Sequence, residues 1–148
     1  MSATILKIIP TNSTYAPEAI LQDKAKTFLA KFYENKQIEI DTTDAIQFVD
    51  QGANFDSVFC NFCGESIEIK DWQNAMDKAY EKQFANLDFT TLCCNRKTSL
   101  NDLTYDMPAG FAKFQIKILE PIAEIEEKYL KELQQILGTT LRIIWARY

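Results

Sequence analysis

Four cysteines arranged as two close pairs constrain this chain more than any other feature of its sequence. Cys60 and Cys63 form a C-x-x-C motif followed by Gly64, Cys93 and Cys94 are adjacent, and the chain contains no histidine. A C-x-x-C turn presents two sulfur atoms to one point, and the glycine relaxes the backbone behind them. Two pairs of thiolates are a typical donor set for tetrahedral zinc. The sequence therefore predicts a structural Zn²⁺ ion held by Cys60, Cys63, Cys93 and Cys94.

Other uses of the cysteines compete with this interpretation. In thioredoxin-like redox proteins the first cysteine of the motif caps a helix, whereas here Gly64 and an expected strand at residues 66–70 follow the motif. A catalytic zinc of the nucleobase-deaminase kind needs a Cys- or His-x-Glu helix and a Pro-Cys-x-x-Cys motif, and the chain has neither. Buried thiols without a metal do not explain two tight pairs. Structural disulfides are disfavoured in a reducing compartment.

The second pair raises a geometric question. Neighbouring side chains on a strand point to opposite faces, so Cys93 and Cys94 can share an ion only where the backbone turns. Asn95, a residue that tolerates left-handed conformations, favours such a turn. The 29 residues between Cys63 and Cys93 are too many for a minimal zinc ribbon. We therefore expect a ribbon that is interrupted by a helix.

Hydrophobic patterns before the cysteines predict a strand, a helix and a second strand. Residues 3–9 are β-branched and apolar and end at a proline, which is typical of a strand. Apolar residues then recur at helical spacing between Pro17 and Asn35. Residues 37–42 alternate between apolar and charged side chains, so we expect a half-exposed strand there. Residues 48–52 receive no assignment.

The same kinds of element recur after the cysteines. Residues 111–119 alternate clearly and predict a strand, and Pro121 opens a predicted helix that ends at the capping Gly138. A last strand is expected at residues 141–145. The full order is the split βαβ, or ferredoxin-like, pattern of an α+β fold, in which two helices cover one face of an antiparallel sheet.

The cysteines fall inside an expected insertion between the second and third strands of that sheet. We expect one domain over residues 1–148, with residues 55–105 forming an inserted zinc-ribbon-like region. This region contains a helix at residues 71–84, in which Asp71 is the expected cap and Trp72 begins an apolar stripe. The stripe is interpreted as core packing.

Net charge and composition limit the cellular compartments and the kinds of binding partner that we expect for this protein. The net charge is −5, and one divalent cation on four thiolates would make it −7. This balance disfavours a broad nucleic-acid interface, which needs clustered lysine and arginine. The early apolar run at residues 5–9 is too short for a signal peptide or a membrane span. We expect a cytoplasmic protein that does not associate with membranes.

Recognisable catalytic constellations are missing from the sequence. Without histidine, Ser-His-Asp, Cys-His and zinc-protease chemistry are excluded. The sequence has no glycine-rich phosphate loop, and acidic residues such as Glu124 and Glu127 fall on a solvated helix face. Isolated pairs such as Asp102 and Asp106 are interpreted as turn residues. We therefore expect no enzymatic activity, and an enzyme that uses carboxylates in a cleft ranks last among the hypotheses.

The segment that follows the second cysteine pair carries a family resemblance. Residues 98–112, TSLNDLTYDMPAGFA, and the ending LRIIWARY resemble an uncharacterised family of bacterial cytoplasmic proteins. The resemblance covers about the last 90 residues, from the C-x-x-C-G motif onward, although Arg147 stands where a histidine is expected in relatives. It implies a zinc-ribbon-like site at the four cysteines and no established activity. Taken by itself, the segment Ser99–Gly110 is interpreted as a structural turn.

Two binding functions remain open. The first is a zinc-stabilised protein–protein interaction module with a basic partner, of which an immunity-type protein that masks a basic toxin is one version. The second is a regulator that contacts nucleic acid through Lys70, Arg96, Lys97 and Arg142. The acidic balance favours the first. The sequence indicates neither the identity of the partner nor an oligomeric state.

Overall fold

A four-stranded antiparallel sheet forms the centre of the protein. The structure is a computed structural model and describes residues 3–121 and 123–148. The strand order is β2-β8-β1-β9, and every neighbouring pair is antiparallel. The strands are β1 (Thr4–Pro10), β2 (Ile38–Val49), β8 (Gly110–Leu119) and β9 (Leu141–Arg147).

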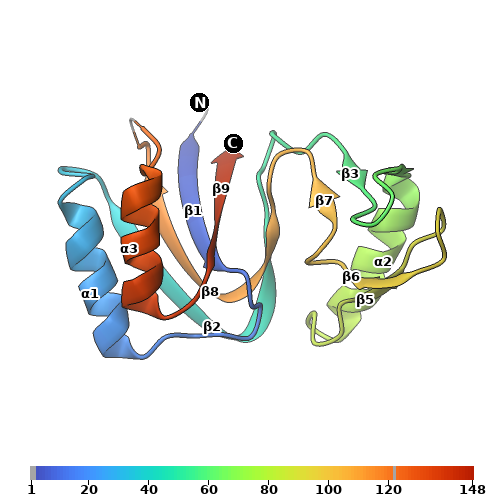
Figure 1. Cartoon of the computed structure of the whole chain (residues 1–148), viewed down its shortest axis with the longest axis horizontal. Helices are drawn as coiled ribbons and strands as arrows, with labels where there is room; N and C mark the ends of the chain where they lie inside the picture. Colours follow the sequence, from blue (N-terminus) through green and yellow to red (C-terminus); the bar gives the residue numbers. More distant parts are fainter. Residues whose placement is uncertain (1–2, 122) are drawn as a thin grey trace.

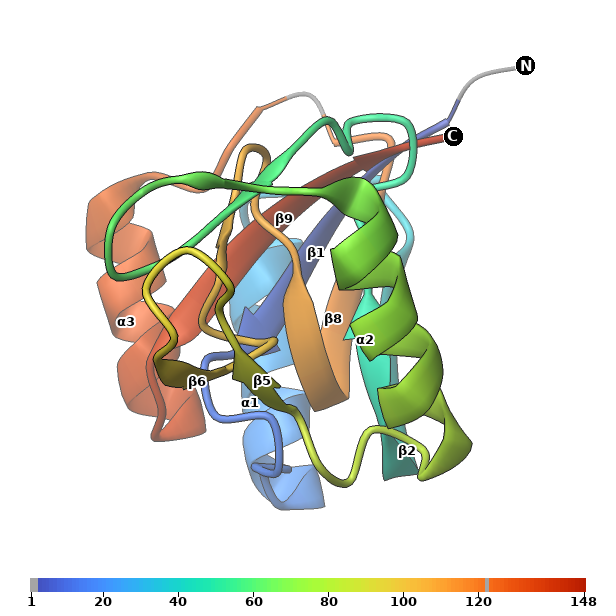
Figure 2. The same ribbon diagram turned by 90° about the vertical axis from the view of Figure 1, so that its right-hand side faces the viewer.

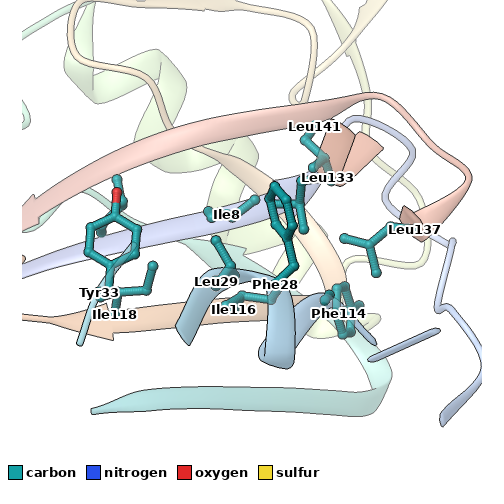
Figure 3. Packing of buried hydrophobic residues seen from close by; sticks show 12 residues of the cluster. Ile8, Phe28, Leu29, Tyr33, Phe114, Ile116, Ile118, Leu133, Leu137 and Leu141 are labelled. Atoms are coloured by element: carbon teal, nitrogen blue, oxygen red, sulfur yellow. The ribbon is translucent and has the colours of Figure 1, made fainter. Parts of the chain in front are cut away.

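Helices α1 (Ala19–Ala30) and α3 (Glu127–Leu137) cover one face of this sheet, as Figure 1 shows. Ile8 and Ile116 point from the sheet toward Leu29 of α1 and Leu133 of α3, and all four are fully buried (Figure 3). Each such side chain contributes about 1.5–3 kcal/mol relative to an exposed one. This α+β body therefore has a hydrophobic core of its own.

The chain between β2 and β8 forms short strands and one helix on the opposite side of the sheet (Figures 1 and 2). We call residues 55–105 the cysteine region. Its strands make a three-stranded sheet, in the order β4-β3-β7, and a separate β5-β6 hairpin. The elements are β3 (Val58–Phe59), β4 (Ser66–Ile67), α2 (Ile69–Glu81), β5 (Asp88–Thr90), β6 (Lys97–Ser99) and β7 (Thr104–Tyr105).

A second hydrophobic cluster joins the cysteine region to the sheet. Phe111 of β8 is fully buried and packs against Phe48 of β2 and Phe84, with ring centroids 5.1 and 5.3 Å away. Trp72 of α2 donates a hydrogen bond from its indole N–H to the hydroxyl of Tyr105, at 3.3 Å. As predicted, Trp72, Met76 and Ala79 of the apolar stripe of α2 are core, whereas Tyr80, at the end of the stripe, is 70% exposed. The stripe packs with Phe48 and Phe111 on the side of the sheet opposite α1 and α3.

The segment Ser99–Gly110 is held by side-chain hydrogen bonds that span three parts of the chain. Asn101 donates from Nδ2 to the Thr11 carbonyl at 3.1 Å, and its Oδ1 accepts from the Phe111 N–H at 2.9 Å. The Arg142 guanidinium donates to Asn101 Oδ1 and to the Ala109 carbonyl, at 3.1 and 2.9 Å. β9 is an edge strand, but the guanidinium is drawn into these contacts.

Two helices begin at residues other than those predicted. Helix α2 begins at Ile69 because Trp72 donates its N–H to the Glu68 carbonyl at 3.0 Å, so Asp71 lies in the first turn and residues 66–70 are not one strand. Helix α3 begins only at Glu127. The preceding residues are held by tertiary hydrogen bonds from Tyr33 to the Ala123 carbonyl and from Trp145 to Glu124.

The other boundaries lie closer to the predictions. Helix α1 is shorter than expected, since it ends at Ala30 and the chain turns at Asn35, whose φ is +63°. Strand β2 is longer and continues through the unassigned Phe48 after a bulge between Thr42 and Gln47. Gly138 caps α3 with a φ of +72°, as predicted. Ile122, on the predicted third helix, lies outside the described residues.

Among the residues that the structure describes, no helix has both the length and the apolar character needed to cross a membrane.

Candidate metal centre

The first cysteine pair occupies the tip of the hairpin formed by β3 and β4. The N–H of Cys60 donates to the Glu65 carbonyl at 2.8 Å, and the N–H of Gly64 donates back to the Cys60 carbonyl at 3.0 Å. Gly64 has a φ of +78°, which L side chains rarely adopt. The C-x-x-C-G spacing therefore closes a tight loop in which Cys60 and Cys63 face the same side.

The second pair occupies the tip of the β5–β6 hairpin. The N–H of Thr91 donates to the Arg96 carbonyl at 2.9 Å and closes the loop. Asn95 adopts a φ of +51°, and the chain turns through Cys93 and Cys94. This turn resolves the geometric question that the sequence raised, because the two sulfur atoms lie only 3.7 Å apart.

The two hairpin tips meet and bring all four sulfur atoms together. Cys60 Sγ lies 3.5 Å from Cys94 Sγ, and Cys63 Sγ lies 3.3 Å from Cys93 Sγ. All four lie within 4.8 Å of one another, and together they could hold a metal ion. A tetrahedral ion with bonds of about 2.3 Å to sulfur places its ligands about 3.8 Å apart. The four cysteines fit that geometry.

The electrostatics of the cluster also favour a cation at its centre. Burial disfavours the Cys60 thiolate, but the backbone N–H groups of Cys63 and Phe62 outweigh burial and lower the pKa of Cys60 to about 6. The contact with the Cys63 thiol, followed by burial, raises the pKa of Cys93 to about 12. Without a cation, protons on the thiols therefore remove the negative charges by which four thiolates at this spacing would repel one another. A divalent cation allows all four to ionise, because its own charge dominates the site.

The four ligands differ in exposure to solvent. Cys60 is buried and Cys94 is half-buried, whereas Cys63 and Cys93 are exposed. Cys93 lines a surface depression of about 260 Å³ between the β5–β6 hairpin and the start of α2. Leu92, which is 80% exposed, stands at its edge. The polar side chains that line it include the carboxylates of Glu65, Glu68 and Asp71.

Three of the four basic residues considered for nucleic-acid contact have a partner within the chain. The Arg96 guanidinium lies over the Phe62 ring, 5.3 Å from its centroid, and links the two hairpin tips. Lys97 pairs with Asp88 across the β5–β6 hairpin at 3.1 Å. Arg142 is bound to Asn101 on another side of the cysteine region.

A half-buried ion pair at the sheet was not predicted from the sequence. Lys7 of β1 is 5% exposed, and its Nζ donates to Asp50 Oδ1 at 3.1 Å and to the Tyr148 hydroxyl at 2.8 Å. Burial, followed by the hydrogen bond to Asp50, raises the pKa of Tyr148 to about 12. The one signal for this group was a lysine inside an apolar strand. The group ties the end of β2 to the end of β9 and is interpreted as structural.

Comparison with protein-family models, with curated proteins and with solved structures finds no match.

Proposed function

We propose that Cys60, Cys63, Cys93 and Cys94 bind a structural Zn²⁺ ion and that residues 55–105 form a zinc-ribbon-like region. Sulfur spacings of 3.3–3.7 Å support this proposal, as does the soft, all-thiolate donor set. The ion would join the two hairpins and would supply folding energy to them. The strand order β2-β8-β1-β9, with α1 and α3 on one face, supports a ferredoxin-like topology for the body.

We further propose that the protein is a protein–protein interaction module for a basic partner and not an enzyme. The observation that carries this proposal is the depression beside Cys93, where an exposed leucine stands next to carboxylates. An apolar anchor with a charged rim is typical of a protein interface. The net charge of −2 on a zinc ion with four thiolates would add to the negative potential of Glu65, Glu68 and Asp71.

An immunity-type role is one version of this proposal. The family resemblance of the segment TSLNDLTYDMPAGFA is a separate prediction. Both are compatible with a cytoplasmic location. Nucleic-acid contact through Lys70, Arg96, Lys97 and Arg142 is the weaker alternative, because Arg96, Lys97 and Arg142 each have a partner within the chain.

Native mass spectrometry tests the metal and affinity purification tests the partner. We expect one zinc per chain, released by a chelator, and a basic protein that co-purifies from the source cells. The variant Leu92→Ser/Glu65→Lys should lose this protein. A matched variant, Glu127→Lys/Glu132→Lys, changes two acidic residues of α3 on the far side of the sheet and should retain it. Absence of metal from the native protein would refute the zinc site, and equal binding by both variants would refute the proposed surface.

A further inference from the structure

The two hairpin tips share a closing backbone hydrogen bond and a residue of positive φ at the same place in the loop. In the first, the loop 60–65 is closed by the hydrogen bond from the Cys60 N–H to the Glu65 carbonyl, and in the second, the loop 91–96 is closed by the equivalent bond from Thr91 to Arg96. The residue before the closing position has a positive φ in both loops, +78° at Gly64 and +51° at Asn95. Residue n of the first loop therefore corresponds to residue n + 31 of the second.

This correspondence gives the four cysteines unequal positions. Cys63 corresponds to Cys94, so these two ligands are equivalent. The partner of Cys60, however, is Thr91, and both residues are buried at 2% and 0% exposure. The Oγ1 of Thr91 lies 3.5 Å from Cys94 Sγ, close to the spacing between ligand sulfur atoms in the cluster. A threonine therefore occupies the position from which a fourth ligand would reach the ion in two identical loops.

Cys93 supplies the fourth sulfur from a different position. It corresponds to Phe62, which is 44% exposed. Like Phe62, Cys93 is exposed, and it lines the depression beside Leu92. Movement of its side chain away from the cluster would therefore open the ion toward that depression and leave the other three sulfur atoms in place.

We propose that Cys93 is the exchangeable ligand of the metal centre and that a small cationic thiol can replace it. This inference rests on the proposed zinc site. In the exchange, the incoming thiol binds the ion as a thiolate and its proton passes to the sulfur of Cys93, so that no electron is transferred. Glu65 and Glu68 line the depression, and their charge favours a thiol that carries an amine over one that carries a carboxylate.

Cobalt-loaded variants test the unequal positions, because thiolate-to-cobalt charge transfer reports how many sulfur atoms are bound. Cys93→Ser should keep one cobalt ion and lose about a quarter of the charge-transfer intensity, since one of four thiolates is removed. Added cysteamine should restore the intensity at lower concentration than 3-mercaptopropionate. Thr91→Cys/Cys93→Ser should show the full four-thiolate spectrum without added thiol and should not respond to cysteamine. Cys60→Ser is the control and should lose the ion.

Alkylation of the unmodified, zinc-loaded protein tests exchange in the native ligand set. With limiting iodoacetamide, peptide mapping should find Cys93 modified first, through a new S–C bond and release of iodide, while the zinc stays bound. Exposure alone predicts equal modification of Cys63 and Cys93. Equal modification, or loss of the ion from Cys93→Ser as complete as from Cys60→Ser, would overturn the inference. A wild-type protein that binds neither zinc nor cobalt would instead refute the proposed metal site itself.

Discussion

The body and the cysteine region are stabilised by different interactions. The strands of the body are 7–12 residues long, pair in long registers and share a core with two helices. The strands of the cysteine region are only two or three residues long. Such short strands cannot set their own register or bury a face of their own. The stability of the cysteine region therefore depends on two further contributions. These are the hydrophobic cluster around Phe111 and the proposed ion between the hairpin tips.

Removal of the metal should have the largest effect, and this effect should fall on the cysteine region rather than on the body. For thiolate zinc sites the apparent binding energy is about 10–16 kcal/mol, and it is folding energy for the surrounding segment. We expect Cys60→Ser, or a chelator, to open the hairpins and expose Trp72 to water. Amide exchange should rise in β3–β7 and stay slow in β1 and β8, and Trp72 fluorescence should shift to the red. Equal exchange throughout the chain would show that the two regions unfold as one.

Paired truncations of two buried phenylalanines on β8 should separate the two cores. Phe111→Ala and Phe114→Ala should each lower the free energy of unfolding by about 3–5 kcal/mol, because each leaves a cavity. Phe111 packs in the cluster of the cysteine region and Phe114 packs against α1 and α3. Only Phe111→Ala should therefore weaken zinc binding, measured by competition with a chelator. Equal zinc affinities in the two variants would contradict this separation.

Loss of the Asn101 side chain should lower the free energy of unfolding by a smaller amount, because it weakens the junction between the cysteine region and the body. Asn101→Ala removes the bond to the Thr11 carbonyl and leaves the buried Phe111 N–H without its partner, and such an unsatisfied buried group costs about 1–3 kcal/mol. Urea unfolding should show the loss. Asn86→Ala is a matched control, because Asn86 accepts a hydrogen bond from the nearby Asp88 N–H in an exposed loop. An effect of Asn86→Ala as large as that of Asn101→Ala would contradict the assigned role.

The smallest predicted effect concerns pH and the ion pair of the body. Burial opposes ionisation of Asp50, but the Tyr148 hydroxyl and the Lys7 ammonium together outweigh burial and lower its pKa. A lowered folded-state pKa adds stability above the unfolded value near 4, and this stability is lost as the pH falls through the folded value. The stability of the wild-type protein should therefore decrease below pH 4 more steeply than that of Asp50→Asn. Parallel pH profiles from thermal unfolding would contradict this role of Asp50.

The sequence predicted best where one local pattern decides the structure. Alternation in β8 and the glycine after α3 both determine local conformation without help from distant residues, and both predictions were close. The start of α3 was missed because Tyr33 and Trp145, far away in the chain, bind the residues before it. The clustering of the four cysteines followed from their spacing. The equivalent positions of Thr91 and Cys60 could not be predicted in this way, because they depend on backbone hydrogen bonds and no residue pattern indicates those bonds.

The way in which the cysteine region joins the sheet also indicates how the protein could be redesigned. β2 and β8 are neighbouring antiparallel strands, and Val49 pairs with Gly110 at the point where the region leaves and rejoins the sheet. The whole region thus occupies the place of a hairpin loop, and the closure entropy of a loop grows only slowly with its length. A short turn, with polar residues at Phe48 and Phe111, would convert the protein into a minimal scaffold. Other recognition units could then be grafted at the same point.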